Sequence, residues 1–314
     1  MQYPLERGLP GMQRQREAAV VDGQRRWCAT LRTQQVLLGK KLAKSGKESI
    51  RRLRSMRLTT LSGIRFMSFP VRFNCVAGCG ACCKGRFVPL TLAETEAWLA
   101  RGDEVVVLLE AFSRDADDTC AEYQHKHARS AEARCGSTDV QVIAVFAAAN
   151  LQGCPNQLAD TRCGIYSERP LVCRIYPMEV NPFIALEPEA KECPSNAWSQ
   201  PLGEQLIASD GQPPRALQQL IESSRQADRE DAQAKVDICR HLGFTTAAWK
   251  GNGFTVFFPT GEQLRQAISL RGQEQAPEVQ WKVRAHGEPV LEQLAQLGMQ
   301  LTDEAPDHLF IALA

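Results

Sequence analysis

Four cysteines fall within nine residues of the segment FNCVAGCGACCKGR, which spans positions 73–86. They are Cys75, Cys79, Cys82 and Cys83. Thiolates at such short spacings can converge on one ion, and soft sulfur ligands select zinc, copper(I) or iron–sulfur clusters over hard cations. The neighbouring Gly78 and Gly80 allow the tight turns that this convergence needs. The spacing therefore predicts a metal site.

A second group of cysteines lies downstream in a segment rich in turn-forming residues. Its members are Cys154, Cys163, Cys173 and Cys193. Pro155, Pro170 and Pro177 interrupt this segment, so that it has little regular structure to pack. We therefore expect all eight cysteines to be metal ligands, with the metal supplying folding free energy that burial does not.

Disulfides are a poorer explanation for these thiols. The N-terminus lacks the apolar region of a secretory signal, and no apolar run approaches the ~18–20 residues of a membrane span. We expect a cytoplasmic protein, and a reducing compartment favours metal ligation over disulfide formation. A bond between adjacent Cys82 and Cys83 would also be strained.

The cysteine pattern resembles a known family. The run Cys75–Cys83, together with CGIYSERPLVCRIYP at 163–177, resembles the YkgJ-type cysteine-cluster family of zinc- or iron-chelating domains with a CxxCxxCC motif and eight cysteines. The resemblance covers roughly residues 70–195 and implies the same eight ligands. This chain has three residues between its first two cysteines, where the family pattern has two, and this weakens the assignment of Cys75.

The longer spacing also matches the Cys-x3-Cys-x2-Cys of radical S-adenosylmethionine enzymes. Ala81 stands where those enzymes usually have an aromatic residue, and no repeated βα units follow. A motif needs its structural context, so this match is read as accidental.

The ligand count leaves the metal open. Eight cysteines suit two four-coordinate zinc ions, or a [4Fe–4S] cluster with four ligands and spare thiols. Phe73, Phe87 and Ile165 could exclude solvent, while Arg169 and Arg174 could offset thiolate charge or form surface ion pairs. We favour an iron–sulfur cluster, with zinc as the alternative.

Three functions fit these residues. The first is a metal-binding protein with an iron–sulfur or zinc centre, which includes an iron–sulfur oxidoreductase. The resemblance implies a second, because some relatives are flagellin lysine N-methylases, but the chain lacks a recognisable glycine-rich methyl-donor site. The third is a non-catalytic structural zinc module. No nucleophile elbow, P-loop or dinucleotide fingerprint is present, and no catalytic residue is assigned.

Three regions are expected along the chain, with an α+β fold. Residues 1–64 form a basic, partly helical N-terminal extension, residues 65–200 a small turn-rich cysteine-cluster domain organised by metal, and residues 201–314 an α+β region. Capping boxes at Thr91 and Thr260 predict helix starts, and 215–242 and 289–297 are expected to be helical. Strands are expected at 140–146, 254–258, 279–285 and 309–313, whereas 105–112 fits either a helix or a buried strand.

The charge is divided unevenly. Residues 1–65 hold 15 Lys and Arg against 4 Asp and Glu, and the remainder holds 22 against 32. This basic arm could contact an acidic surface, such as nucleic acid, anionic lipid or the acidic body of the protein itself, or be a solvated extension. Translation from Met56 or Met67 is a further alternative. The sequence identifies no partner or substrate.

Overall fold

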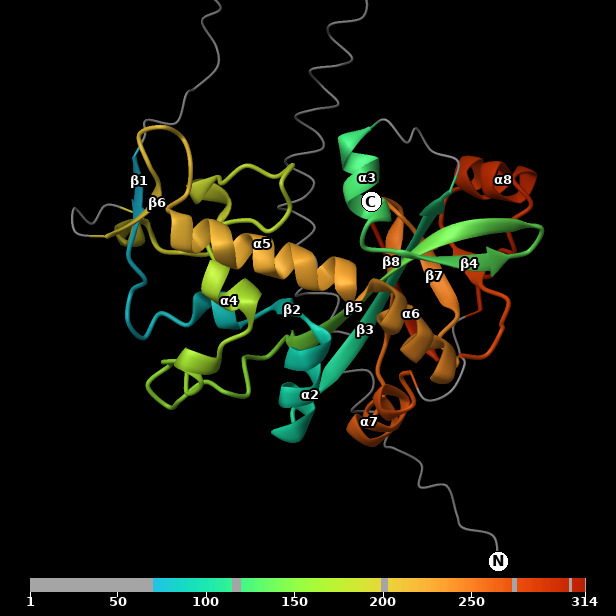
Figure 1. Ribbon diagram of the computed structural model, residues 1–314, viewed down its shortest axis with the longest axis horizontal. Helices are drawn as coiled ribbons and strands as arrows, with labels where there is room; N and C mark the ends of the chain where they lie inside the picture. Colours follow the sequence, from blue (N-terminus) through green and yellow to red (C-terminus); the bar gives the residue numbers. More distant parts are fainter. Residues whose placement is uncertain (1–69, 115–119, 199–202, 273–275, 305–306, 314) are drawn as a thin grey trace, which may run out of the picture.

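The computed structural model describes most of the chain after the basic arm (Figure 1). The described residues are 70–114, 120–198, 203–272, 276–304 and 307–313. The extension expected over 1–64 and Cys28 lie outside them. In the described part of the chain, no helix is long and apolar enough to cross a membrane.

An eight-stranded mixed sheet forms the centre of the described structure, with the path β10-β8-β3-β5-β2. Its strands are β2 (Arg86–Leu90), β3 (Val105–Ser113), β4 (Ala131–Cys135), β5 (Thr138–Asn150), β7 (Thr246–Trp249), β8 (Gly253–Phe257), β9 (Lys282–Arg284) and β10 (His308–Ala312). Strand β5 pairs with β3 along one edge and with β2 and β4 along the other. Strand β7 runs parallel to β3 and β9, while the other pairs are antiparallel.

Helices cover one face of this sheet. The α-helices are α2 (Leu92–Ala100), α3 (Ala121–His127), α4 (Leu171–Ile175), α5 (Arg215–Glu230), α6 (Ala232–His241), α7 (Gly261–Ser269) and α8 (Glu288–Gln296). Trp98 of α2, Ile238 of α6, Leu264 of α7 and Leu294 of α8 share one buried cluster with Phe146 of β5. Alternate residues of β3 enter this cluster, as the period of two in a strand requires.

A smaller two-stranded sheet lies to one side (Figure 1, left). Strands β1 (Val71–Phe73) and β6 (Glu204–Ile207) pair antiparallel. Phe73 of β1 and Leu206 of β6 are buried in one hydrophobic cluster. Trp198 packs against Phe73 with ring centroids 5.0 Å apart. The small sheet thus has a hydrophobic cluster of its own.

Several local predictions are confirmed. Thr91 and Thr260 each cap a helix through a complete capping box, with Glu94 and Gln263 as the reciprocal partners. The helix expected over 215–242 is present as α5 and α6, which meet at Asp231. The mixture of helices and sheets confirms the α+β class.

Other segments differ from expectation because of pairing partners distant in sequence. The ambiguous run 105–112 is strand β3, held between β5 and β8. The polar stretch between β3 and β5 contains strand β4 besides α3. The main sheet takes strands from both 65–200 and 201–314, and the boundary between these regions stays a prediction.

Candidate metal centre

The first cysteine loop is shaped by glycines. The chain leaves β1 and turns at Gly78 and Gly80, whose φ angles of 72° and 61° lie in the left-handed region. The 3₁₀ turn η1 (Ala81–Cys83) follows and places Cys82 and Cys83 immediately before β2. The Cys83 N–H donates to the Gly80 carbonyl at 3.0 Å, which closes this turn.

The second loop begins where β5 ends. The Gln157 N–H donates to the Cys154 carbonyl at 3.1 Å, and Gln157 forms an isolated β-bridge with Cys163. The Gly164 N–H donates to the Asn156 carbonyl at 2.8 Å. Residues 154–164 therefore form a compact hairpin-like loop with a cysteine at each end.

The two loops contact each other directly. The Thr161 hydroxyl donates to the Gly78 carbonyl, and Gln157 Nε2 donates to the Thr161 carbonyl at 3.0 Å. A Cβ atom at Gly80 would overlap Gln157 Nε2. The absence of a side chain at Gly80 thus lets segments far apart in sequence approach closely.

The remaining two cysteines sit on short elements. Cys173 lies on α4, which follows η2 (Tyr166–Glu168) and lies between α5 and β2 in Figure 1. Cys193 lies between η3 (Pro188–Ala190) and η4 (Ser195–Ala197). Cys193 Sγ and Tyr176 Oη are 3.5 Å apart, within hydrogen-bonding reach of sulfur.

One set of thiols gathers near the small sheet. Burial raises the pKa of Cys75, and the charges of Cys82 and Cys79 raise it further. Burial likewise raises the pKa of Cys193, with Tyr176 opposing and the charges of Cys82, Cys75 and Cys79 adding to the rise. These four cysteines are therefore electrostatic neighbours.

A second set gathers beside the main sheet. Burial raises the pKa of Cys173 to about 12, and the charges of Cys82, Cys154 and Cys163 contribute in the same direction. Burial raises the pKa of Cys154, and Cys163 adds to this rise. The pKa of Cys83 is raised chiefly by its hydrogen bond to Cys82. The charges of Cys154 and Cys173 raise it further.

Cys82 joins the two sets and has the opposite shift. The hydrogen bond from Cys83 lowers the pKa of Cys82 to about 6, against the effect of burial. Arg86 and Arg169 also lower this pKa. The pKa of Cys82 is thus lowered while the pKa values of its neighbours Cys83, Cys173 and Cys193 are raised.

Cationic side chains surround the thiols. The guanidinium of Arg86 lies 5.2 Å from the ring centroid of Tyr176, and that of Arg169 lies 3.7 Å from the ring of Tyr166. Arg86 Nε is buried and has no hydrogen-bond partner among the described residues. A buried, unused N–H donor near Cys82 suits an environment where sulfur carries negative charge.

Not every residue that the sequence suggested faces the cysteines. Arg174 is exposed, and Phe87 packs against the cluster on the other face of the main sheet. Ile165 is half-buried beside the main core together with Cys154 and Cys173, and Phe73 is buried next to Cys193.

The cysteines outside the two loops are dispersed. Cys120 is exposed, whereas Cys135 is buried with its Sγ 3.7 Å from the Gln300 carbonyl oxygen. His125 packs edge-on against Phe183, and Cys239 is fully buried in the core. Cys120, His125, His127 and Cys135 therefore form no metal-binding group in the described part of the chain.

The described cysteines are all free thiols, with no disulfide among them. Within the described ranges, no three His, Cys, Asp or Glu side chains are gathered tightly enough to hold an ion as they stand. Metal ligation by the eight cysteines thus stays a proposal, supported by their neighbour relations.

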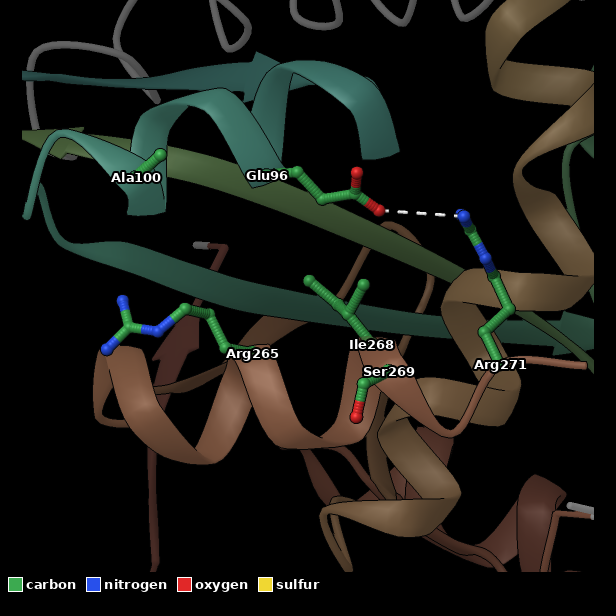
Figure 2. Close-up of a pocket in the computed structure, with 6 residues that line it drawn as sticks. All are labelled: Glu96, Ala100, Arg265, Ile268, Ser269 and Arg271. Carbon is green, nitrogen blue, oxygen red and sulfur yellow. Dashed lines mark ion pairs between the residues drawn. The ribbon is translucent and has the colours of Figure 1, made fainter. Parts of the chain in front are cut away.

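An open groove lies elsewhere, between α2 and α7 (Figure 2). It is lined by Glu96, Ala100, Arg265, Ile268, Ser269 and Arg271. Arg271 Nη2 and Glu96 Oε1 form an ion pair at 3.5 Å across it, and no cysteine is among its lining residues.

Residues 74–194 match the model of the CxxCxxCC family, described as a "putative zinc- or iron-chelating domain". This range contains all eight candidate cysteine ligands. No curated protein and no solved structure matches the chain. The match supports metal binding in general and leaves zinc and iron as alternatives.

Proposed function

We propose that this protein binds an iron–sulfur cluster or zinc through its clustered cysteines, because residues 74–194 match the model of the zinc- or iron-chelating CxxCxxCC family. The observation that carries the proposal is the meeting of two distant cysteine segments. Cys82 and Cys83 of the first loop neighbour Cys173 and Cys154 of the second segment, and a Thr161–Gly78 hydrogen bond joins the loops.

The chemistry of the donor set fits a soft metal. Burial raises the pKa of Cys75 and of Cys193, and the charges of neighbouring cysteines raise both pKa values further. A bound cation removes this repulsion and displaces the protons. The positive charges of Arg86 and Arg169 offset the negative charge of a set of cysteine thiolate ligands.

Among the soft metals, we favour an iron–sulfur cluster, with zinc as the alternative. Cysteine-only coordination is common to both. Such a cluster supplies one-electron redox chemistry, which makes an oxidoreductase the activity to test if iron is found. Zinc would instead make the domain a structural module.

The decisive experiment uses the full chain purified without oxygen. Its absorption spectrum is recorded, and iron, zinc and acid-labile sulfide are measured per chain. Broad absorption near ~400 nm with equal iron and sulfide supports a cluster. A colourless protein with stoichiometric zinc supports the structural alternative. Folded protein that binds neither metal, even after reconstitution, overturns the proposal.

A further inference from the structure

Thr161, in the second cysteine loop, has an unusual backbone conformation. Its φ angle is 65°, and in the described part of the chain it is the one residue other than glycine with a positive φ. A β-branched side chain is strained there, because its Cβ approaches the following carbonyl oxygen, whereas glycine adopts this conformation freely. Such strain persists only where the surrounding structure imposes it, and it gathers at functional sites.

The turn that contains Thr161 imposes this conformation. The Thr161 N–H donates to the Leu158 carbonyl at 2.9 Å, and the Leu158 N–H donates to the Arg162 carbonyl at 2.8 Å. The turn closes the hairpin-like loop in which Gln157 pairs with Cys163. In a three-residue hairpin loop of this kind the last residue is usually left-handed, and glycine fits that position best. A threonine here therefore has a cost that a glycine would not have.

The threonine side chain supplies a contact that glycine would lack. The Thr161 hydroxyl donates to the Gly78 carbonyl of the first cysteine loop, and its oxygen also lies 2.7 Å from the Asp160 carbonyl oxygen. A Cβ atom at Gly78 would lie 3.4 Å from Thr161 Oγ1, and one at Gly80 would lie 3.4 Å from Thr161 Cβ. Gln157 Nε2 donates to the Thr161 carbonyl at 3.0 Å. Thr161 thus lies where the first loop meets the second.

This contact has a cysteine close by in each loop. Cys79 lies between Gly78 and Gly80, the two glycines that face the turn, and Cys163 follows Thr161 by two residues. A displacement of the loops at Thr161 would therefore move these two thiols relative to each other.

We propose that Thr161 is a positioning residue of the cysteine site, whose hydroxyl holds the second cysteine loop against the first. This inference rests on the proposed function and deepens it, because cysteines of the two segments can meet at a metal only while the loops stay together. Thr161 acts through the loops and is not itself a ligand. Its left-handed conformation directs the hydroxyl at Gly78, which is the use of the strain.

The test separates the hydroxyl from the strain. Thr161→Ser is the matched control that keeps the hydroxyl, whereas Thr161→Val keeps the shape and the strain without it. Thr161→Gly removes both the hydroxyl and the strain. Each full-length variant is loaded with the metal that the wild-type chain carries. Its rate of metal transfer to a chelator is then measured beside its melting temperature.

We expect T161V and T161G to lose metal about two- to tenfold faster than wild type, the change expected for one lost hydrogen bond, and T161S to lose it at the wild-type rate. T161G should nevertheless melt at a higher temperature than T161V, because glycine is unstrained at this φ. Metal loss that instead follows the melting temperatures, with T161G as slow as wild type, would give Thr161 a merely structural role and overturn the proposal.

A second readout needs no metal. Iodoacetamide labelling of half-buried Cys82 and Cys163 in the metal-free folded chain is followed by peptide mass spectrometry, with exposed Cys120 as the internal reference. Both half-buried thiols should be labelled faster in T161V than in T161S, and equal labelling would contradict the loop contact. Folded wild-type protein that binds no metal would contradict the proposed function instead, and the labelling would still decide the role of Thr161.

Discussion

Individual residues set the electrostatics of this protein. Burial raises the pKa of Cys173, whereas the hydrogen bond from Cys83 lowers the pKa of Cys82. If these thiols ligate a metal as proposed, its uptake should release protons, mainly from the buried positions. Burial also shifts the pKa of titratable groups that do not face the cysteines.

His308 is such a group, and it should make stability depend on pH. Its imidazole is buried at the start of β10, and burial lowers its pKa below the ordinary 6.5. Asp307 opposes this shift, while Arg284 adds to it. The unfolded chain then binds a proton before the folded chain does, so the free energy of unfolding is highest above pH ~6.5 and falls as the pH drops below it.

The measurement is urea unfolding of wild type and His308→Gln between pH 8 and pH 5. The uncharged amide of H308Q has no such proton to bind, so the variant should lose less stability than wild type over this range. Parallel losses in the two proteins would mean that His308 does not contribute.

Gly80 sits where the two cysteine loops touch, and Gly85 provides a control. Both have positive φ, and alanine at either costs ~1–2 kcal/mol of backbone strain. Only alanine at Gly80 would also collide with Gln157, because nothing lies within 4 Å of a Cβ at Gly85. We expect G80A to lose metal faster than G85A in dialysis against a chelator, with similar melting temperatures. Equal metal loss would contradict a role for the loop contact.

At the scale of elements, α2 holds the second cysteine segment against the sheet. Glu94 accepts the Thr91 N–H within its capping box and, with its other oxygen, the Leu171 N–H of α4 at 2.7 Å. Farther along, Arg101 pairs with Glu168, and Asp103 accepts from Asn156. The helix thereby fixes the element that carries Cys173.

Replacing Glu94 should loosen this attachment. Glu94→Gln leaves one oxygen to serve two donors and should cost ~1 kcal/mol. We expect faster metal transfer to a chelator in E94Q, because α4 is less firmly placed. Glu96→Gln on the same helix, which breaks only a surface pair with Arg271, should transfer metal at the wild-type rate. Equal rates in the two variants would show that Glu94 is not a positioning residue.

Elements also show how far sequence reasoning reaches. Both capping boxes were predictable because each lies within four residues. Strand β3 was not, since its continuous apolar run suits a helix or a buried strand, and its partners β5 and β8 are distant in sequence. The cysteine spacing predicted the eight candidate ligands, but nothing local indicates that Cys193 neighbours Cys75, or that Glu94 reaches α4.

At the scale of the whole molecule, the main sheet and the cysteine segments differ in how much hydrophobic core stabilises them. The main sheet has a large core, with Val107 and Phe146 fully buried, whereas the cysteine segments lie at its margin with half-buried or exposed thiols. The sheet should therefore persist when metal is removed, and the cysteine segments should not.

Hydrogen exchange of the full chain with and without metal tests this difference. Amides in 74–85 and 151–194 should exchange faster after chelation, while those of β3 and β5 stay protected. Exchange that accelerates throughout the chain would show that the metal supports the sheet as well.

The most direct test of metal ligation by these cysteines is X-ray absorption at the edge of the bound metal in the full chain. We expect a first shell of sulfur alone, four per metal, at ~2.3 Å if the metal is zinc. With iron, a sulfur shell with iron neighbours beyond it is expected. A first shell dominated by nitrogen or oxygen would contradict ligation by the cysteines, because the metal would then be held by other residues.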